Sequence, residues 1–143
     1  MKKLLTILFL FIVVSIKAQP KKHREALGNA ELLEIAIFST KDSSAVDKLF
    51  AKTIHFGWPD GTTESREEAI KHIVNNKSTY TEKIMPSAYN VREVDDSLIV
   101  KHMYKTEEKK TDGAILLLSF SIETVSAKEN GKWKLFRCQI TKL

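Results

Sequence analysis

Three histidines stand where an imidazole could take part in acid–base chemistry: His55, His72 and His102. A general base needs a pKa that burial or a charged partner has moved toward neutrality. His55 lies near Trp58 on one expected strand, and His102 lies near Tyr104 on another. We therefore expect His55 or His102 to act as the base if the protein is an enzyme, and His72 to lie on a solvent-exposed helix flank.

Carboxylates that could complete such a site are few in the second half of the chain. In that half, Glu93 and Glu123 fall within expected strands. In the first half, Asp60 falls in the turn Pro59-Asp60-Gly61. No two histidines have the spacing of metal ligands, and the chain has neither a glycine-rich phosphate loop nor a nucleophile elbow. The sequence therefore predicts no metal, no cofactor and no recognisable catalytic motif.

The closing stretch WKLFRCQ sets an arginine and a glutamine among bulky apolar residues. Side chains alternate between the two faces of a strand. One face would carry Trp133, Leu135, Arg137 and Gln139, and the other would carry Phe136, Cys138 and Ile140. Because unpaired polar groups are costly to bury, either neighbours at the sheet rim satisfy Arg137 and Gln139, or they line a wet cavity inside the subunit. We expect the cavity.

The candidate ligand-contacting residues are polar or aromatic side chains of the elements that would surround this cavity. They are Trp58, Tyr89, His102, Tyr104, Arg137 and Gln139. Arg137 and Gln139 would hold a polar or anionic end of a ligand, while the aromatic side chains would pack against its body.

Helices occupy the first half of the expected fold. Apolar residues recur at helical spacing from Ala26 to Ile37, and the polar run 39–44 ends that helix. A second, short helix would be capped by Ser43 or Ser44. A strand is expected over 53–58, and the capping box Ser65-Arg66-Glu67-Glu68 begins a third helix that ends at Asn75-Asn76.

Strands occupy the second half. Continuous or alternating apolar residues predict strands over 88–94, 98–105, 114–127 and 132–142. Asp95-Asp96 and the charged stretch 106–113 would be turns, and Asn130-Gly131 is a strong hairpin signal. The order predicts an α+β fold, in which helices cover one face of a curved antiparallel sheet.

The amino terminus has the pattern of a secretory signal. A basic start is followed by an apolar run from Leu4 to Ile16, which is too short to span a membrane, and then by Ala18. We expect residues 1–18 to be removed, 19–23 to form a flexible lead-in, and 24–143 to form one domain of a secreted or periplasmic protein with no membrane attachment. Cleavage removes three lysines and no acids, so the net charge falls from +5 to +2. That charge gives no electrostatic case for nucleic acid binding.

A partner is expected on the outer sheet face. Ile115-Leu116-Leu117-Leu118 is apolar on both sides of its strand, so both sheet faces need covering. Helices cover only one of them, and a homodimer through the apolar face of the last strand, with Phe136 and Cys138, would cover the other. Cys138 is the only cysteine, so no internal disulfide can form, and it is expected to be an inert core or interface residue.

The chain resembles the nuclear transport factor 2-like (cystatin-like) superfamily, and within it the small secreted proteins near the SnoaL-like branch. The resemblance covers residues 24–143 and is most specific at Gly131-Lys132-Trp133-Lys134-Leu135. It implies a cone-shaped sheet around an internal pocket, commonly in a dimer. Members include isomerases, dehydratases, hydrolases and cyclases, and many have no known activity, so the fold does not fix the function.

Three functions follow as hypotheses. The first is a secreted domain that binds a small, mostly apolar molecule without transforming it. The second is a lyase- or isomerase-like enzyme with a histidine base, and the third is a dimeric interaction module with a filled core. An open cavity with a histidine within hydrogen-bond reach of a carboxylate would favour the enzyme.

Overall fold

The computed structural model describes residues 19–81 and 88–143. The predicted signal segment 1–18 lies outside these residues and stays a prediction. The helices are α1 (Lys21–Ile35), the π-helix η1 (Ala36–Thr40), α2 (Ser43–Leu49) and α3 (Arg66–Asn75). The strands are β1 (Phe50–Gly57), β2 (Thr63–Glu64), β3 (Thr79–Tyr80), β4 (Asn90–Val94), β5 (Ser97–Lys109), β6 (Ile115–Glu129) and β7 (Lys132–Lys142).

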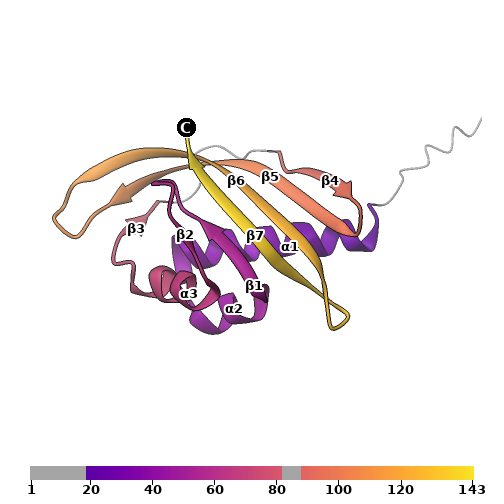
Figure 1. The fold of residues 1–143 in the computed structure, drawn as a ribbon. Helices are drawn as coiled ribbons and strands as arrows, with labels where there is room; N and C mark the ends of the chain where they lie inside the picture. The colour runs from indigo at the N-terminus through magenta and orange to yellow at the C-terminus, as the bar shows by residue number, and fades with distance from the viewer. Residues whose placement is uncertain (1–18, 82–87) are drawn as a thin grey trace, which may run out of the picture.

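The strands form one curved sheet with the helices on its inner face, which confirms the predicted α+β fold (Figure 1). The antiparallel meander from β4 to β7 is also confirmed. The sheet is mixed, however, because β1 pairs with β7 in parallel. Its order is β2-β1-β7-β6-β5-β3, with β4 also paired to β5, and the two ends of that path do not pair with each other.

The pairing register shifts within β7, and this decides which side chains enter the core. Ser126 pairs with Leu135 and Val125 pairs with Arg137, so Phe136 opposes no residue of β6. An extra residue of this kind inverts the facing of the residues that follow it. Leu135 and Cys138 are therefore both fully buried.

The shift overturns the expected facing of the last strand. Arg137 is exposed, and it lies with Gln139 on the outer face, away from the helices. Cys138 and Ile140 are buried in the subunit's own core, so they cannot form the predicted dimer interface. Cys138 is a core residue, and burial raises the pKa of its thiol, which favours the unreactive form.

Local sequence signals place the helices well. The inner face of α1 buries Ala26, Ala30 and Leu33 as predicted, although the helix already begins at Lys21. The predicted capping box of α3 is confirmed, since the Ser65 N–H donates to the Glu68 carboxylate over 2.9 Å.

The second helix differs from expectation at its first turn. Asp42 caps α2, since its carboxylate accepts from Ser44 N at 2.9 Å and from Ala45 N at 3.4 Å. The predicted caps, Ser43 and Ser44, lie within the helix instead. A charged acceptor at the helix start also matches the positive end of the helix dipole, which favours Asp42.

Two apolar clusters hold the helices on the sheet. The larger joins η1, α2 and α3 to β1, β6 and β7, and the smaller sets Ala26 and Ala30 of α1 against Leu98 and Val100 of β5. Over residues 19–81 and 88–143, no helix combines the length and apolar character that crossing a membrane requires.

Replacing the Asp42 cap tests this assignment. Asp42→Ala should lower the free energy of unfolding by about 1 kcal/mol, because two helix N–H groups lose their acceptor. Ser43→Ala, one residue later, should change the free energy of unfolding by only about a few tenths of a kcal/mol. Urea denaturation measures both variants, and a larger loss for Ser43→Ala would contradict the assignment.

Candidate functional site

A pocket, here called the mouth pocket, opens between η1, the end of α3 and the strands β5, β6 and β7 of the curved sheet. This mouth pocket has a volume of about 520 Å³. Its apolar wall includes Ile37, Phe38, Leu118, Phe120 and Ile140. Its polar and aromatic rim includes Trp58, His72, Asn76, Tyr80 and Glu108. Concave apolar surface with a few convergent polar groups is typical of small-molecule sites.

One carboxylate organises the first side of the rim. Glu64 of β2 accepts from His72 Nδ1 at 2.9 Å and from Trp58 Nε1 at 2.5 Å, one bond to each oxygen. The Trp58 and His72 rings also lie against each other, with centroids 4.1 Å apart. The site therefore holds a histidine in a fixed orientation between a carboxylate and an indole.

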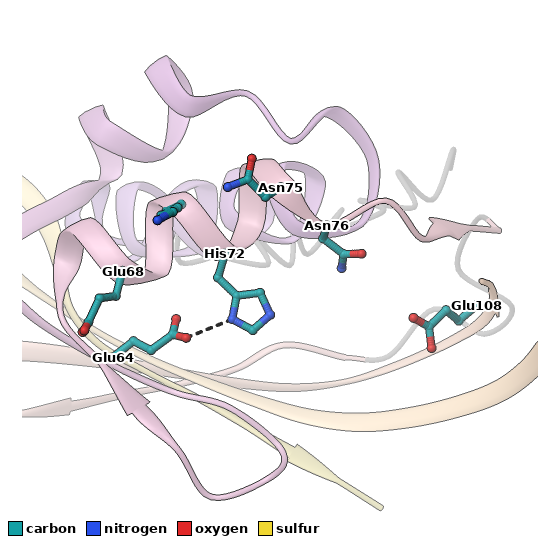
Figure 2. Close-up of a pocket in the computed structure, with 7 residues that line it drawn as sticks. Glu64, Glu68, His72, Asn75, Asn76 and Glu108 are labelled. Atoms are coloured by element: carbon teal, nitrogen blue, oxygen red, sulfur yellow. Dashed lines mark hydrogen bonds and ion pairs between the residues drawn. The ribbon is translucent and has the colours of Figure 1, made fainter. Parts of the chain in front are cut away.

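This arrangement sets the chemistry of the imidazole. Because a carboxylate only accepts, Nδ1 of His72 carries a proton, and in the neutral imidazole Nε2 is then an acceptor. Figure 2 shows Nε2 directed away from Glu64, into the space between α3 and Glu108. The side chain is 47% exposed, so a ligand in that space can reach it.

A second polar group forms the opposite side of the rim. Asn76 donates to the Tyr80 hydroxyl at 2.9 Å, and that hydroxyl donates to Glu108 at 3.4 Å. Asn76 is the C-cap residue of α3 and follows His72 by four residues, so the two side chains lie on the same side of the helix end. The two sides of the rim thus approach each other across one helical turn.

Burial and charge keep the Tyr80 phenol protonated. Burial is the main cause that raises its pKa, and the nearby Glu108 carboxylate raises it further. Lys41 fixes this part of the chain, because its ammonium donates to the Asn76 carbonyl at 2.6 Å and to the Ser78 carbonyl. Tyr80 therefore keeps its one O–H donor at neutral pH, and that donor is directed to Glu108.

An open depression over α3 continues from the rim. It has a volume of about 660 Å³ and shares His72, Asn76 and Glu108 with the mouth pocket (Figure 2). Glu64, Glu68 and Lys71 line it as well. Over the described residues, no three histidine, cysteine or acidic side chains are grouped to hold a metal ion.

A separate polar cluster lies deeper, between α1 and the sheet. His102 of β5 donates from Nε2 to Glu34 of α1 over 2.7 Å, and the Tyr89 hydroxyl donates to the same carboxylate over 3.3 Å. The Tyr89 ring packs against the imidazole, with centroids 4.4 Å apart. The His102 side chain is fully buried. This pair has the histidine–carboxylate geometry required by the enzyme hypothesis, but solvent does not reach the imidazole.

The predicted site residues fall in three places. Trp58 lies in the mouth pocket. Tyr89, His102 and Tyr104 lie at or beside the deep cluster. His55, Arg137 and Gln139 line a groove of about 350 Å³ on the outer face. The sequence therefore did not group them correctly, because it placed all of them around one cavity.

The Gln139 side chain in this outer groove lies across Gly57 of β1. An added Cβ at Gly57 would stand 2.1 Å from Gln139 Oε1. The glycine is therefore needed for that side chain to lie flat against the sheet.

The rim residues that sequence reasoning missed are His72, Glu64, Asn76, Tyr80 and Glu108. His72 was expected on a solvent-exposed flank, and its partner Glu64 lies outside the helix, on β2. One usable signal was the spacing of His72 and Asn76, which predicts a shared polar face in the last turn of α3.

No protein-family model matches the chain, and no curated protein matches it. Solved structures do. A nuclear transport factor 2-like protein from Cytophaga hutchinsonii has a TM-score of 0.72 at 21% identity, over 87% of this chain and 100% of that one. An uncharacterised protein with a cystatin-like fold from Caulobacter vibrioides has a TM-score of 0.71 at 10% identity, over 87% of this chain and 91% of that one.

A third similar structure is the association domain of CaMKII from C. elegans, with a TM-score of 0.61 at 16% identity, over 84% of this chain and 94% of that one. The chain thus has the nuclear transport factor 2-like fold, which confirms the fold that the resemblance implied. Sequence identities this low show the fold alone, so membership of the superfamily and of its SnoaL-like branch stays a prediction.

The environment of Tyr80 predicts how its phenol ionises with rising pH. Its phenol should ionise above the ordinary pKa of 10.0, because burial and Glu108 disfavour the phenolate. Glu108→Gln should bring the midpoint closer to 10.0 by removing the negative charge. Tyrosine ring-carbon NMR across the alkaline range measures both, with Tyr80→Phe to assign the signal. A wild-type midpoint at or below 10.0 would show that the ring is solvated.

Proposed function

We propose that the chain binds a small, mostly apolar molecule in the mouth pocket. The observation that carries the proposal is an apolar-walled hollow with His72 held at its rim by Glu64 and Trp58. A rim whose polar groups already have fixed partners loses little freedom when a ligand arrives.

The rim also defines the polar end of the ligand. His72 Nε2 accepts hydrogen bonds, and the Tyr80 hydroxyl can donate one once its single proton turns from Glu108, 3.4 Å away, to the ligand. A hydroxyl group, which both donates and accepts, fits between them. Trp58 and the apolar wall would pack against the body of the molecule, as the sequence predicted for Trp58.

An acid–base enzyme is the second candidate, and the Glu64–His72 pair favours it. A carboxylate that holds Nδ1–H fixes the orientation of the ring and aims Nε2 at the pocket. His72 would act as the base and Glu64 as its positioning residue. This replaces His55, which lies on the outer face, and His102, which is buried. A His72→Gln protein that binds its ligand but no longer transforms it would favour the enzyme.

Export and self-association complete the proposal. We infer that residues 1–18 are removed during secretion, so that the mature chain begins at Gln19. A second copy would cover the outer face of the sheet at β5 and β6. By strand alternation this face carries Met103, Ile115 and Leu117, all exposed. The similarity to an association domain is consistent with self-association.

Native mass spectrometry of the exported protein tests the ligand and the cleavage together. We expect a chain beginning at Gln19 that carries a small molecule. Trp58→Ala should weaken that binding by about tenfold or more, because it removes a wall of the pocket and one partner of Glu64. Arg137→Ala should leave binding unchanged, and the reverse result would move the site to the outer groove.

Sedimentation tests the proposed partner surface. The wild-type protein should sediment as a dimer, and Leu117→Asp should shift it to monomer, since Leu117 is 71% exposed and its loss costs the monomer little. Leu32→Asp is the matched control, because Leu32 is 51% exposed on α1. A wild-type protein that sediments as a monomer would contradict the proposed dimer.

A further inference from the structure

Several polar residues that the sequence singled out have no part in the mouth pocket. His55, Arg137 and Gln139 line the outer groove, together with Gly57 and Thr63. These residues come from three neighbouring strands, β2, β1 and β7. The groove lies on the outer face of the sheet and the mouth pocket on the inner face, so a molecule in the groove would be a second ligand.

A guanidinium and an imidazole form one wall of the groove. His55 and Arg137 are directly paired across β1 and β7, so their side chains project next to each other from the outer face. Both residues are exposed. Within residues 19–81 and 88–143, neither side chain makes a hydrogen bond or an ion pair with the protein. Their N–H groups are therefore available to a ligand.

The groove has its depth because β1 carries a glycine there. Phe56 is buried on the inner face, so Gly57 follows it on the outer face. A Cβ at Gly57 would stand 2.1 Å from Gln139 Oε1, so a larger residue would displace that side chain. Gln139 instead lies flat, with its Nε2 donating to the Ile140 carbonyl at 3.1 Å. The result is a notch in the sheet surface between β2 and β7.

The charge of the groove favours an anion. Among the described residues that line it, none is acidic. Glu123 of β6 opposes Gln139, but Glu123 does not line the groove, and Lys101 of β5 opposes it in turn. A negative ligand therefore meets positive charge in the groove and no carboxylate.

The donors of the groove suit a phosphate group. Arg137 offers a planar fork of N–H groups, His55 offers an imidazole N–H, and Thr63 offers a hydroxyl. Because they come from three strands, these donors approach a ligand from different directions. A phosphate group has three acceptor oxygens for them, whereas a carboxylate has two. The groove volume of about 350 Å³ also leaves room for an organic part of the ligand.

We propose that the outer groove binds the phosphate group of a small phosphorylated molecule. Arg137 and His55 hold the phosphate oxygens, and Thr63 donates a further hydrogen bond. This site is separate from the mouth pocket and goes beyond the proposed function. The proposed partner surface lies over β5 and β6, so a dimer leaves the groove over β1 and β2 open.

Phenyl phosphate, inorganic phosphate and benzoate are suitable probes, compared at constant ionic strength. The ring protons of His55 and the Nε–H of Arg137 report binding by NMR. Phenyl phosphate should shift both signals and bind more tightly than benzoate, because it has one more oxygen and a larger charge. It should also bind more tightly than inorganic phosphate, because its ring packs in the rest of the groove.

Four variants test the assigned residues. Arg137→Gln should weaken phenyl phosphate binding about fivefold, the upper range for an exposed ion pair. Arg137→Lys should weaken it less, because it keeps the charge but loses the planar fork. Lys132→Gln is the matched control, since it removes an exposed cation from the same strand outside the groove, and it should change the affinity less than about twofold. His72→Gln, in the mouth pocket, should have no effect.

Three results would overturn the proposal. Equal weakening by Arg137→Gln and Lys132→Gln would show that only the general surface charge attracts phosphate. Benzoate that binds as tightly as phenyl phosphate would assign the groove to carboxylates, and inorganic phosphate that binds as tightly would remove the organic part of the ligand. Signals of His55 and Arg137 that stay still with phenyl phosphate at tens of millimolar would show that the groove is no site.

Discussion

The register shift at Phe136 determines the inside of this molecule. With one residue of β7 left unpaired, Leu135, Cys138 and Ile140 all point toward the helices. Ile140 then becomes part of the mouth pocket wall. The same shift turns Arg137 and Gln139 outward, so the polar side chains of the last strand lie on the opposite face from the pocket. Without it, the apolar wall and the buried core would compete with an arginine for the same space.

Two sets of polar groups on the inner side of the fold are each organised by one glutamate. Glu64 unites β2, α3 and the end of β1 at the mouth by accepting from His72 and Trp58. Glu34 unites α1 with β5 by accepting from His102. A carboxylate with several donors loses less on burial than an unpaired one, so these sets can exist beside an apolar core. The histidines of the two sets differ in exposure, since the His72 side chain is 47% exposed and the His102 side chain is fully buried.

Local signals in the sequence were reliable for the fold. The Asn130-Gly131 hairpin, the capping box at Ser65 and the alternation of β5 all depend on residues close in the chain. The parallel pairing of β1 with β7 depends on a contact between the two halves of the chain, which no local pattern encodes. The shift at Phe136 was hidden for a similar reason, because strand alternation assumes an unbroken ladder.

The sites were harder to predict than the fold, since their residues come from different elements. Trp58 lies beside the mouth pocket, but its partners Glu64 and His72 lie on a short strand and a helix. Glu34 and His102 are 68 residues apart, so their pairing requires the packing of α1 on β5. Spacing within one element could never have joined them.

A crystal structure of the exported protein with the molecule it carries tests the central claim most directly. Density for that molecule should lie in the mouth pocket, against Trp58 and within hydrogen-bond distance of His72 Nε2. Density in the outer groove beside Arg137 and Gln139, with an empty mouth pocket, would contradict the account.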